Sequence, residues 1–245
     1  MSLVTAKVDN GQPVSSVSPA IAMIDEGNAL EEQGRMAEAM ARYEAAIQTD
    51  PRCARAHLNR GNILLAGGKF NEARSAYQLA IACDPHYAAA HFNLGNVNYR
   101  VGEFELALRN YREAIAIKPD FADAFVAAAN ALDTLGRTAE AVESYQRALA
   151  INPGYAEVHL NLGMLAMAQG RHDEAVKSLR RAVEIKPDLA QAHRTLGLEL
   201  SNLGDLDGAE SSYRRALAIE PQSEGILYEL AMLLRARGKA SEALP

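Results

Sequence analysis

The sequence has no tryptophan, only two cysteines and few aromatic residues, and it lacks any long apolar run. Cys53 and Cys83 are too few for a disulfide-stapled secreted module, which favours a reducing compartment. No stretch approaches the roughly 20 apolar residues needed to cross a bilayer, so no membrane contact is expected. The first residues also lack the apolar block of a signal peptide. These absences together predict a cytoplasmic protein.

Basic residues are in the minority, since 25 Lys and Arg stand against 31 Asp and Glu, giving a formal net charge of −6. Binding of nucleic acid regardless of its sequence needs a basic face that displaces counterions from phosphates. No nucleic-acid partner is therefore expected. With 245 residues, 49% of them hydrophobic, the chain can form one or two compact domains, and a collagen-like or disordered chain is excluded.

What the sequence does contain is a strict period of 34 residues. Six of the nine prolines follow it without an insertion: Pro51, Pro85, Pro119, Pro153, Pro187 and Pro221. A glycine row keeps the same spacing: Gly34, Gly68, Gly102, Gly136, Gly170, Gly204 and Gly238. Further rows hold small residues or large apolar ones, mostly tyrosine. A fixed period of this length is typical of repeat proteins.

Each period contains two segments with helical spacing of apolar residues. In residues 88–101 the apolar positions are Ala90, Leu94 and Val97, and a similar segment follows the glycine. The glycine suits a left-handed helix cap, and the proline ends the second helix because it cannot donate to the helical ladder. One such hairpin leaves an apolar face uncovered, so neighbouring hairpins must stack. The period thus predicts a helical solenoid.

The order of small residue, glycine turn, alanine, aromatic, alanine and proline resembles the tetratricopeptide (TPR) repeat. The segments Asn93-Leu94-Gly95-Asn96 and Ala114-Ile115-Ala116-Ile117-Lys118-Pro119 are similar to its consensus. The resemblance implies an all-α fold, a right-handed superhelical solenoid of stacked antiparallel helix hairpins. We expect this solenoid over residues 20–245, after a flexible extension of residues 1–19. Its repeats are expected at 20–53, 54–87, 88–121, 122–155, 156–189 and 190–223, with a partial seventh at 224–245.

Nothing in the repeats predicts catalysis. Four histidines occupy one position of different repeats: His57, His91, His159 and His193. Zinc ligands must lie about 2 Å from one ion, and equivalent atoms of stacked repeats cannot converge in that way. These rings are expected to fill the slot where the TPR family often has tryptophan. The sequence predicts no catalytic residue, no cofactor and no metal site, and hence no enzymatic activity in this chain.

The TPR resemblance implies that partners bind a concave groove lined by the first helix of each hairpin. Two rows of amides fall on these helices, namely Asn28, Asn62, Asn96 and Asn130, and Asn59, Asn93 and Asn161. A carboxamide has donors and an acceptor that match those of a peptide bond, so the rows could hold an extended peptide. The alternative is that the amides hydrogen-bond within the repeats and only support the fold.

Other side chains are expected in the same groove. Phe92 and Tyr99 would form one apolar station, and Leu160, Met164 and Met167 a second, with inter-repeat packing as the alternative for both. Arg55 and Arg100 complete the set of candidate groove residues.

The sequence predicts a non-catalytic module that binds a peptide or partner protein. TPR cochaperones grip acidic heat-shock protein tails with paired lysine and asparagine residues. Here the positions before the asparagines are apolar, as at Leu58, so this partner is not expected. One alternative is the substrate-recognition arm of a larger glycosyltransferase-type enzyme, similar to the TPR region of protein O-GlcNAc transferases, with its catalytic domain beyond residue 245. Another is a scaffold that forms a homo-oligomer through uncapped terminal repeats.

Overall fold

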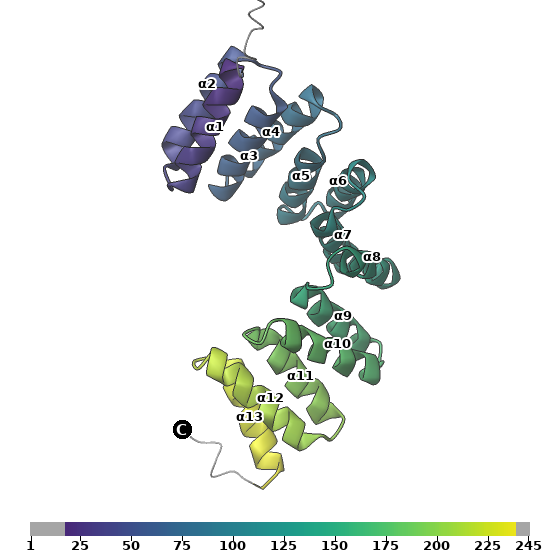
Figure 1. The fold of residues 1–245 in the computed structure, drawn as a ribbon. Helices are drawn as coiled ribbons and strands as arrows, with labels where there is room; N and C mark the ends of the chain where they lie inside the picture. The colour runs from purple at the N-terminus through teal and green to yellow at the C-terminus, as the bar shows by residue number, and fades with distance from the viewer. Residues whose placement is uncertain (1–17, 239–245) are drawn as a thin grey trace, which may run out of the picture. The chain divides into compact units, whose positions relative to one another are not determined.

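The computed structural model describes residues 18–238, and within this range the chain is all-α, without a strand (Figure 1). Helices of 13 or 14 residues follow one another through short turns. Their bounds are α1 Pro19–Glu32, α2 Met36–Thr49, α3 Ala54–Ala66, α4 Phe70–Cys83, α5 Ala88–Arg100, α6 Phe104–Ile117, α7 Ala122–Thr134, α8 Thr138–Ile151, α9 Ala156–Ala168, α10 His172–Ile185, α11 Ala190–Asn202, α12 Leu206–Ile219 and α13 Glu224–Ala236. The predicted all-α class is confirmed. Most of the predicted flexible extension, up to residue 17, and the end of the partial seventh repeat, from residue 239, lie outside the described residues.

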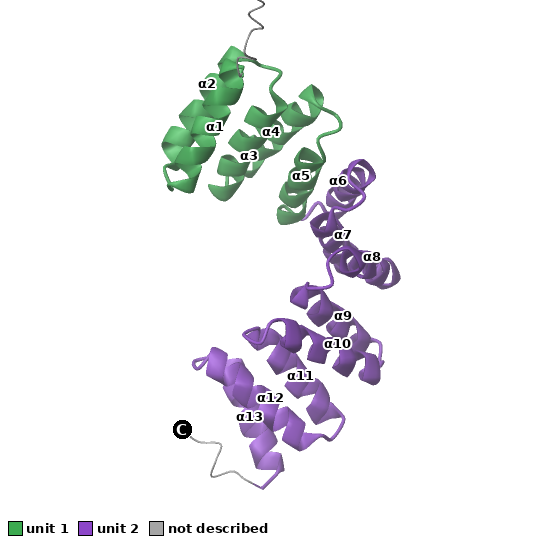
Figure 2. Ribbon diagram, viewed as in Figure 1, with its two compact units in different colours: residues 1–101 green, residues 102–245 purple. Residues whose placement is uncertain are grey.

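The chain divides into two compact units, residues 1–101 (unit 1) and 102–245 (unit 2) (Figure 2). In unit 1, α1 packs on α2 and α3 on α4, and α3 also contacts α5. In unit 2, the hairpins are α7 with α8, α9 with α10 and α11 with α12, while α11 contacts both α9 and α13. Within each unit the first helices of successive hairpins therefore lie next to one another and share a face, which we call the first-helix face.

The glycine row turns the chain between the two helices of a hairpin. All seven glycines of this row have a positive φ, between 69° and 82°. At Gly136 the turn is closed by two hydrogen bonds, from the Gly136 N–H to the Asp133 carbonyl (2.9 Å) and from the Arg137 N–H to the Leu132 carbonyl (2.8 Å). This left-handed geometry costs least without a side chain, which explains the row.

A further row of small residues with the 34-residue spacing, which includes Gly27, Gly61, Gly163 and Gly197, lets the two helices of a hairpin touch. A Cβ at Gly61 would lie 2.6 Å from Cε1 of Tyr77, and one at Gly163 would lie 2.7 Å from Cγ of Leu179. The large residues that face these glycines are buried. So are the alanines of two more rows of this spacing, which are Ala39, Ala73, Ala107, Ala141, Ala175 and Ala209, and Ala46, Ala80, Ala114, Ala148, Ala182 and Ala216. The period in the sequence is thus a period of core contacts.

Three histidines of the histidine row bond to the backbone of the preceding turn. Nε2 of His57 lies 2.9 Å from the carbonyl oxygen of Pro51, six residues earlier, and the same contact occurs at His91 and His193. A carbonyl oxygen only accepts, so Nε2 carries the proton. Through this hydrogen bond each of the three rings connects the first turn of a first helix to the preceding proline turn.

Candidate functional site

The predicted amides of unit 1 form a hydrogen-bonded network. Both the Tyr77 hydroxyl (2.9 Å) and Nδ2 of Asn93 (2.8 Å) donate to Oδ1 of Asn62. The tyrosine belongs to the second helix of the same repeat and Asn93 to the first helix of the next. One carboxamide oxygen therefore joins three helices.

The same arrangement occurs one repeat earlier. Oδ1 of Asn28 accepts from the Tyr43 hydroxyl (2.8 Å) and from Nδ2 of Asn59 (2.8 Å). The Tyr43 oxygen also lies 2.7 Å from Oε2 of Glu31, so its single proton is shared between two acceptors. Burial, and then the hydrogen bond to Glu31, raise the pKa of Tyr43. This hydroxyl is accordingly neutral and a donor at physiological pH.

Unit 2 repeats the network once, between α7, α8 and α9. The Tyr145 hydroxyl donates to Oδ1 of Asn130 (2.5 Å), and Nδ2 of Asn161 lies 3.0 Å from the Tyr145 oxygen and 3.4 Å from Oδ1 of Asn130. Six of the seven amides that the sequence places in two rows are thus brought together in three pairs, and each pair is completed by a buried tyrosine.

The network uses the side-chain oxygen of Asn28, Asn62 and Asn130 but leaves the NH2 group of each of these amides available. Nδ2 of Asn28, Asn62 and Asn130 has no acceptor within residues 18–238, and these side chains are half-buried on the first-helix faces. Because Oδ1 is fixed by two donors, the direction of the NH2 group is fixed as well. The amides therefore support the fold through one end and present donors at the other.

The remaining candidates of unit 1 also lie on first helices. Phe92 and Tyr99 are half-buried on α5, where Arg100 is exposed. Arg55, on α3, forms an exposed ion pair with Asp25 of α1, with 3.1 Å between Nη2 and Oδ1. Such a pair contributes little to stability, because solvent screens it.

In unit 2 the predicted apolar station is only partly at the surface. Leu160 belongs to the core between α9, α10 and α11, where it packs with Leu179 and Leu196, and it is 6% exposed. Leu160 is therefore a packing residue and not part of a groove. Met167 is half-buried and packs against the same core, whereas Met164 is 45% exposed.

The sequence-based reasoning missed apolar side chains on α11 and α13. Leu198 and Met232 occupy the same repeat position as Met164, and all three are exposed, as is Tyr228. The signal was in the row itself, because asparagine in the first four repeats gives way to methionine or leucine in the later ones. The first-helix face of unit 2 thus has an apolar part formed by α9, α11 and α13.

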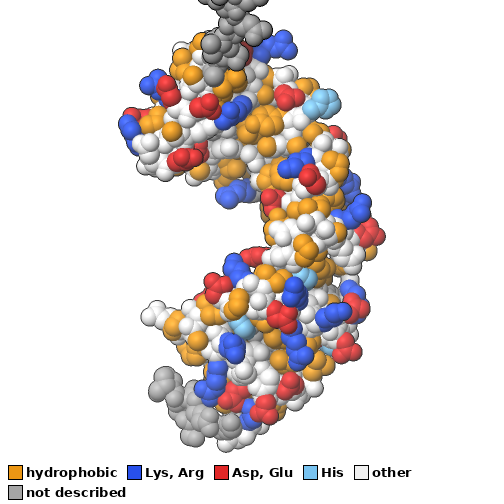
Figure 3. All heavy atoms as spheres, viewed as in Figure 1, with side chains coloured by type: hydrophobic (Ala, Val, Ile, Leu, Met, Phe, Trp, Pro, Cys, Tyr) orange, Lys and Arg blue, Asp and Glu red, His pale blue; other side chains and the backbone are white. Residues whose placement is uncertain are grey.

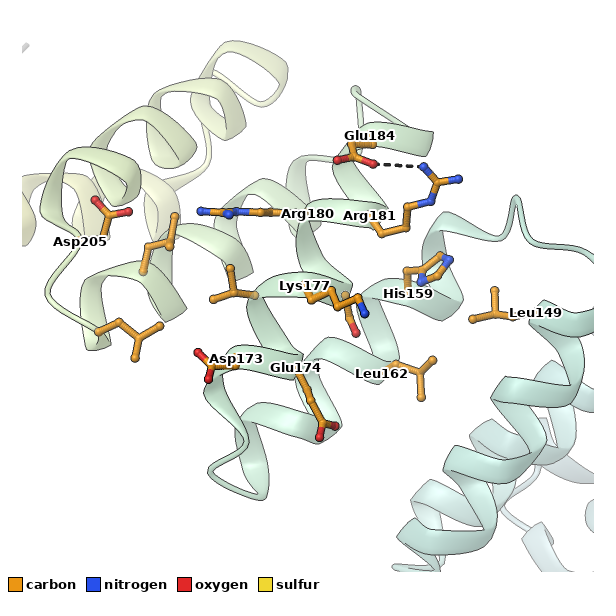
Figure 4. Close-up of a pocket in the computed structure, with 14 residues that line it drawn as sticks. Leu149, His159, Leu162, Asp173, Glu174, Lys177, Arg180, Arg181, Glu184 and Asp205 are labelled. Carbon is orange, nitrogen blue, oxygen red and sulfur yellow. Dashed lines mark hydrogen bonds and ion pairs between the residues drawn. The ribbon is translucent and has the colours of Figure 1, made fainter.

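A second feature of unit 2 is a depression of about 990 Å³ beside α10 (Figure 4). Its walls carry both signs of charge, including Lys177, Arg180 and the ion pair of Arg181 with Glu184, 3.1 Å from Nη1 to Oε2. His159 also lines it, and burial lowers the pKa of this imidazole. The depression thus has charges of both signs on its walls and no strong charge of one sign.

The surface of the described residues mixes charges as well, with Lys and Arg dispersed among Asp and Glu on the face seen in Figure 3. Within residues 18–238, no three His, Cys, Asp or Glu side chains are grouped so that they could hold a metal ion. No helix in that range is long and apolar enough to span a bilayer.

Comparison with known proteins identifies the family. The model of the cilia and flagella-associated protein 70 C-terminal domain, a TPR family, matches residues 10–245. The crystal structure of MamA is similar at 26% identity, with a TM-score of 0.62 over 67% of this chain and 96% of MamA. YrrB, described as a TPR protein with an unusual peptide-binding site, is 22% identical, with a TM-score of 0.63 over 80% of this chain and 97% of YrrB.

PilF of Pseudomonas aeruginosa is 20% identical, with a TM-score of 0.77 over 89% of this chain and 97% of PilF. At such identity the likeness to YrrB and PilF shows the fold alone. No protein of curated function matches the sequence. The chain belongs to the TPR family of the cilia and flagella-associated protein 70 C-terminal domain.

Proposed function

We propose that the chain is a non-catalytic protein-interaction module and that the first-helix face of unit 1 binds an extended peptide. One observation carries the proposal: the NH2 groups of Asn28 and Asn62 are fixed in direction by the bonds to their Oδ1 atoms and have no acceptor among the described residues. A donor that is already oriented loses little conformational freedom when it binds. Family membership and the description of YrrB support a peptide as the ligand.

The chemistry of these donors indicates what part of a peptide they recognise. A neutral carboxamide donates well to a peptide-bond carbonyl, which is a neutral acceptor present at every residue. Recognition of this kind depends little on the side chains of the ligand. Selectivity would then come from neighbouring side chains, such as Phe92 and Tyr99, which lie half-buried on α5.

The proposal is tested by a substitution that separates the two ends of one amide. Asn62→Asp keeps an oxygen for Tyr77 and Asn93 but removes both N–H donors, whereas Asn62→Ala removes both ends. Tyr77→Phe is the matched control, because it removes one bond to Asn62 and leaves the NH2 group in place. Peptides are selected from a random dodecapeptide phage library on the immobilised 245-residue chain, and their Kd is measured by fluorescence anisotropy.

We expect Asn62→Asp to weaken the selected peptides about fivefold or more, which corresponds to about one hydrogen bond, with little change in the thermal midpoint. Tyr77→Phe should lower the thermal midpoint and weaken binding less than Asn62→Asp does, because the NH2 group remains and Asn93 still donates to Oδ1 of Asn62. If wild type selects no peptide, or if Asn62→Asp binds as well as wild type, the proposal is wrong.

The two other functions predicted from the sequence, a recognition arm of a glycosyltransferase-type enzyme and a self-assembling scaffold, stay predictions. The scaffold is tested by light scattering, where a mass that remains that of a single chain at high concentration would exclude it.

A further inference from the structure

One buried tyrosine differs from those in the amide networks. Tyr213 of α12 is 2% exposed, yet its hydroxyl has no hydrogen-bond partner among residues 18–238. In the first, second and fourth repeats the equivalent hydroxyl donates to an asparagine of the first helix. In the sixth repeat that position is Leu198, which has no acceptor. The oxygen that completes the other networks is missing here.

The place of the missing oxygen is a pocket. It has a volume of about 250 Å³ and is lined by residues of α11 and α13 together with Leu206 and Tyr213 of α12. Tyr213 lines the pocket together with the largely apolar side chains of Leu198, Tyr228 and Met232. These three side chains are 40%, 67% and 48% exposed, so no other part of residues 18–238 covers them. A hydroxyl on a buried ring that lines an open, mostly apolar pocket can give a ligand one orienting contact.

The charges beside the pocket are already paired. Glu229 lies on its wall and receives three hydrogen bonds from Arg194, two from Nε (3.1 and 3.0 Å) and one from Nη2 (2.6 Å). Burial, and then the charge of Glu229, raise the pKa of Tyr213 to about 12. The Tyr213 hydroxyl therefore keeps its proton at physiological pH, and the neighbouring carboxylate disfavours an anionic ligand. A neutral acceptor fits the pocket best.

We infer that this pocket binds a peptide-bond carbonyl of a bound peptide, with the adjoining apolar side chain packed on Leu198 and Met232. The carbonyl accepts from the Tyr213 hydroxyl and supplies the oxygen that asparagine supplies in other repeats. The hydroxyl is reached from the pocket, so this bond replaces a contact with water, and the ring that carries the hydroxyl is held in place by its burial. The inference rests on the proposed peptide-binding function and adds a specificity pocket on unit 2 to it.

The pocket is tested by itself with a small probe, N-acetyl-L-leucine N-methylamide, titrated into the 245-residue chain labelled at its methionine methyl groups. We expect the Met232 methyl signal to shift, with binding in the millimolar range that a ligand of this size allows. Tyr213→Phe should weaken the binding about fivefold or more, because the donor is lost while the ring remains. Leu198→Asn should weaken it at least as much, since the new carboxamide can bond to Tyr213 as in the other repeats.

Tyr77→Phe is the control and should bind the probe as wild type does, because it removes a hydroxyl that lies in unit 1. A wild-type chain that shows no shift of the Met232 signal would overturn the inference, and so would Tyr213→Phe and Leu198→Asn variants that bind the probe as tightly as wild type does. Binding of the selected dodecapeptides to the Asn62 and Tyr213 variants distinguishes failure of this inference from failure of the proposed function. If peptides bind and depend on Asn62 but not on Tyr213, the inference alone is wrong.

Discussion

The hydroxyl of Tyr77 donates a 2.9 Å hydrogen bond to Oδ1 of Asn62, 15 residues earlier in the chain. The pair joins the two helices of one hairpin, and the same bond joins Tyr43 to Asn28 and Tyr145 to Asn130. In the fifth repeat both members change, to Met164 and Leu179, so a polar pair becomes an apolar one. In the sixth only the asparagine changes, which leaves Tyr213 without its acceptor.

We predict that Tyr77→Phe lowers the free energy of unfolding by about 1 kcal/mol, the usual contribution of a partly buried hydrogen bond. The ring still fills the core, so only the bond to Asn62 is lost. Tyr213→Phe is the matched control and should change stability less, because its hydroxyl has no partner in the described residues. Urea denaturation of both variants checks this, and equal losses would contradict it.

A second prediction concerns the close approach of helices at Gly61. In Gly61→Ala the new Cβ would lie 2.6 Å from Cε1 of Tyr77, whose buried ring has no room to retreat. We expect a loss of about 1–3 kcal/mol, as is typical of overpacking in a core. Urea denaturation again measures the loss.

Gly67→Ala provides the control for Gly61→Ala. A Cβ at Gly67 would meet the Ile63 carbonyl oxygen at 3.5 Å, an ordinary contact, and the φ of Gly67 is −79°. This variant should be as stable as wild type or slightly more stable. A similar loss in both variants would show that the hairpin tolerates no added side chain at all.

The fold could be predicted from the sequence because every repeat places the same residue in the same surroundings. Gly136 stands in a row, and the row has one physical explanation, a left-handed turn, which the φ of 72° confirms. The proline and alanine rows add to it in the same way. In a periodic sequence the same local pattern is therefore observed in several repeats, and each occurrence supports the same structural interpretation.

The candidate site could be predicted only in part, since a row gives a position but not its surroundings. Leu160 stands beside the amides in the sequence, yet it lies in the core, because α10 and α11 pack over that side of α9. Asn62 can both support the fold and present a donor because its oxygen bonds to Tyr77, 15 residues away. This contact becomes visible only when the two helices are placed side by side. The same spacing, applied to Leu198 and Tyr213, would have revealed the missing acceptor from sequence alone.

A third prediction concerns Gly136, which has no neighbouring atom within 4 Å of an added Cβ but a φ of 72°. Gly136→Ala should cost about 1 kcal/mol, because a left-handed conformation is unfavourable for a residue with a side chain. Gly136→Asn should cost less, since asparagine tolerates this conformation better. The ranking glycine, asparagine, alanine in urea midpoint checks the prediction, and a reversed order for asparagine and alanine would contradict it.

The last prediction concerns pH and His159. Burial, and to a smaller extent the charge of Arg181, lower the pKa of this imidazole below its ordinary value of 6.5, although a bond to the Pro153 carbonyl acts in the opposite direction. At pH 7.5 the ring is neutral in both folded and unfolded chains, so its contribution to stability is complete. As the pH falls through 6.5 the unfolded chain binds the proton first, which favours unfolding. The contribution is lost once the pH lies below the pKa of the folded state.

The urea midpoint should therefore decrease between pH 7.5 and pH 5.5, and His159→Phe should make this decrease smaller. Phenylalanine is a suitable replacement because Phe125 occupies the same position in the fourth repeat. The substitution also removes the bond to Pro153, which can shift the urea midpoint at every pH. The quantity compared between wild type and His159→Phe is therefore the change in urea midpoint from pH 7.5 to pH 5.5. An equal decrease in wild type and His159→Phe would show that other groups cause the pH dependence and that burial of His159 has no measurable effect on it.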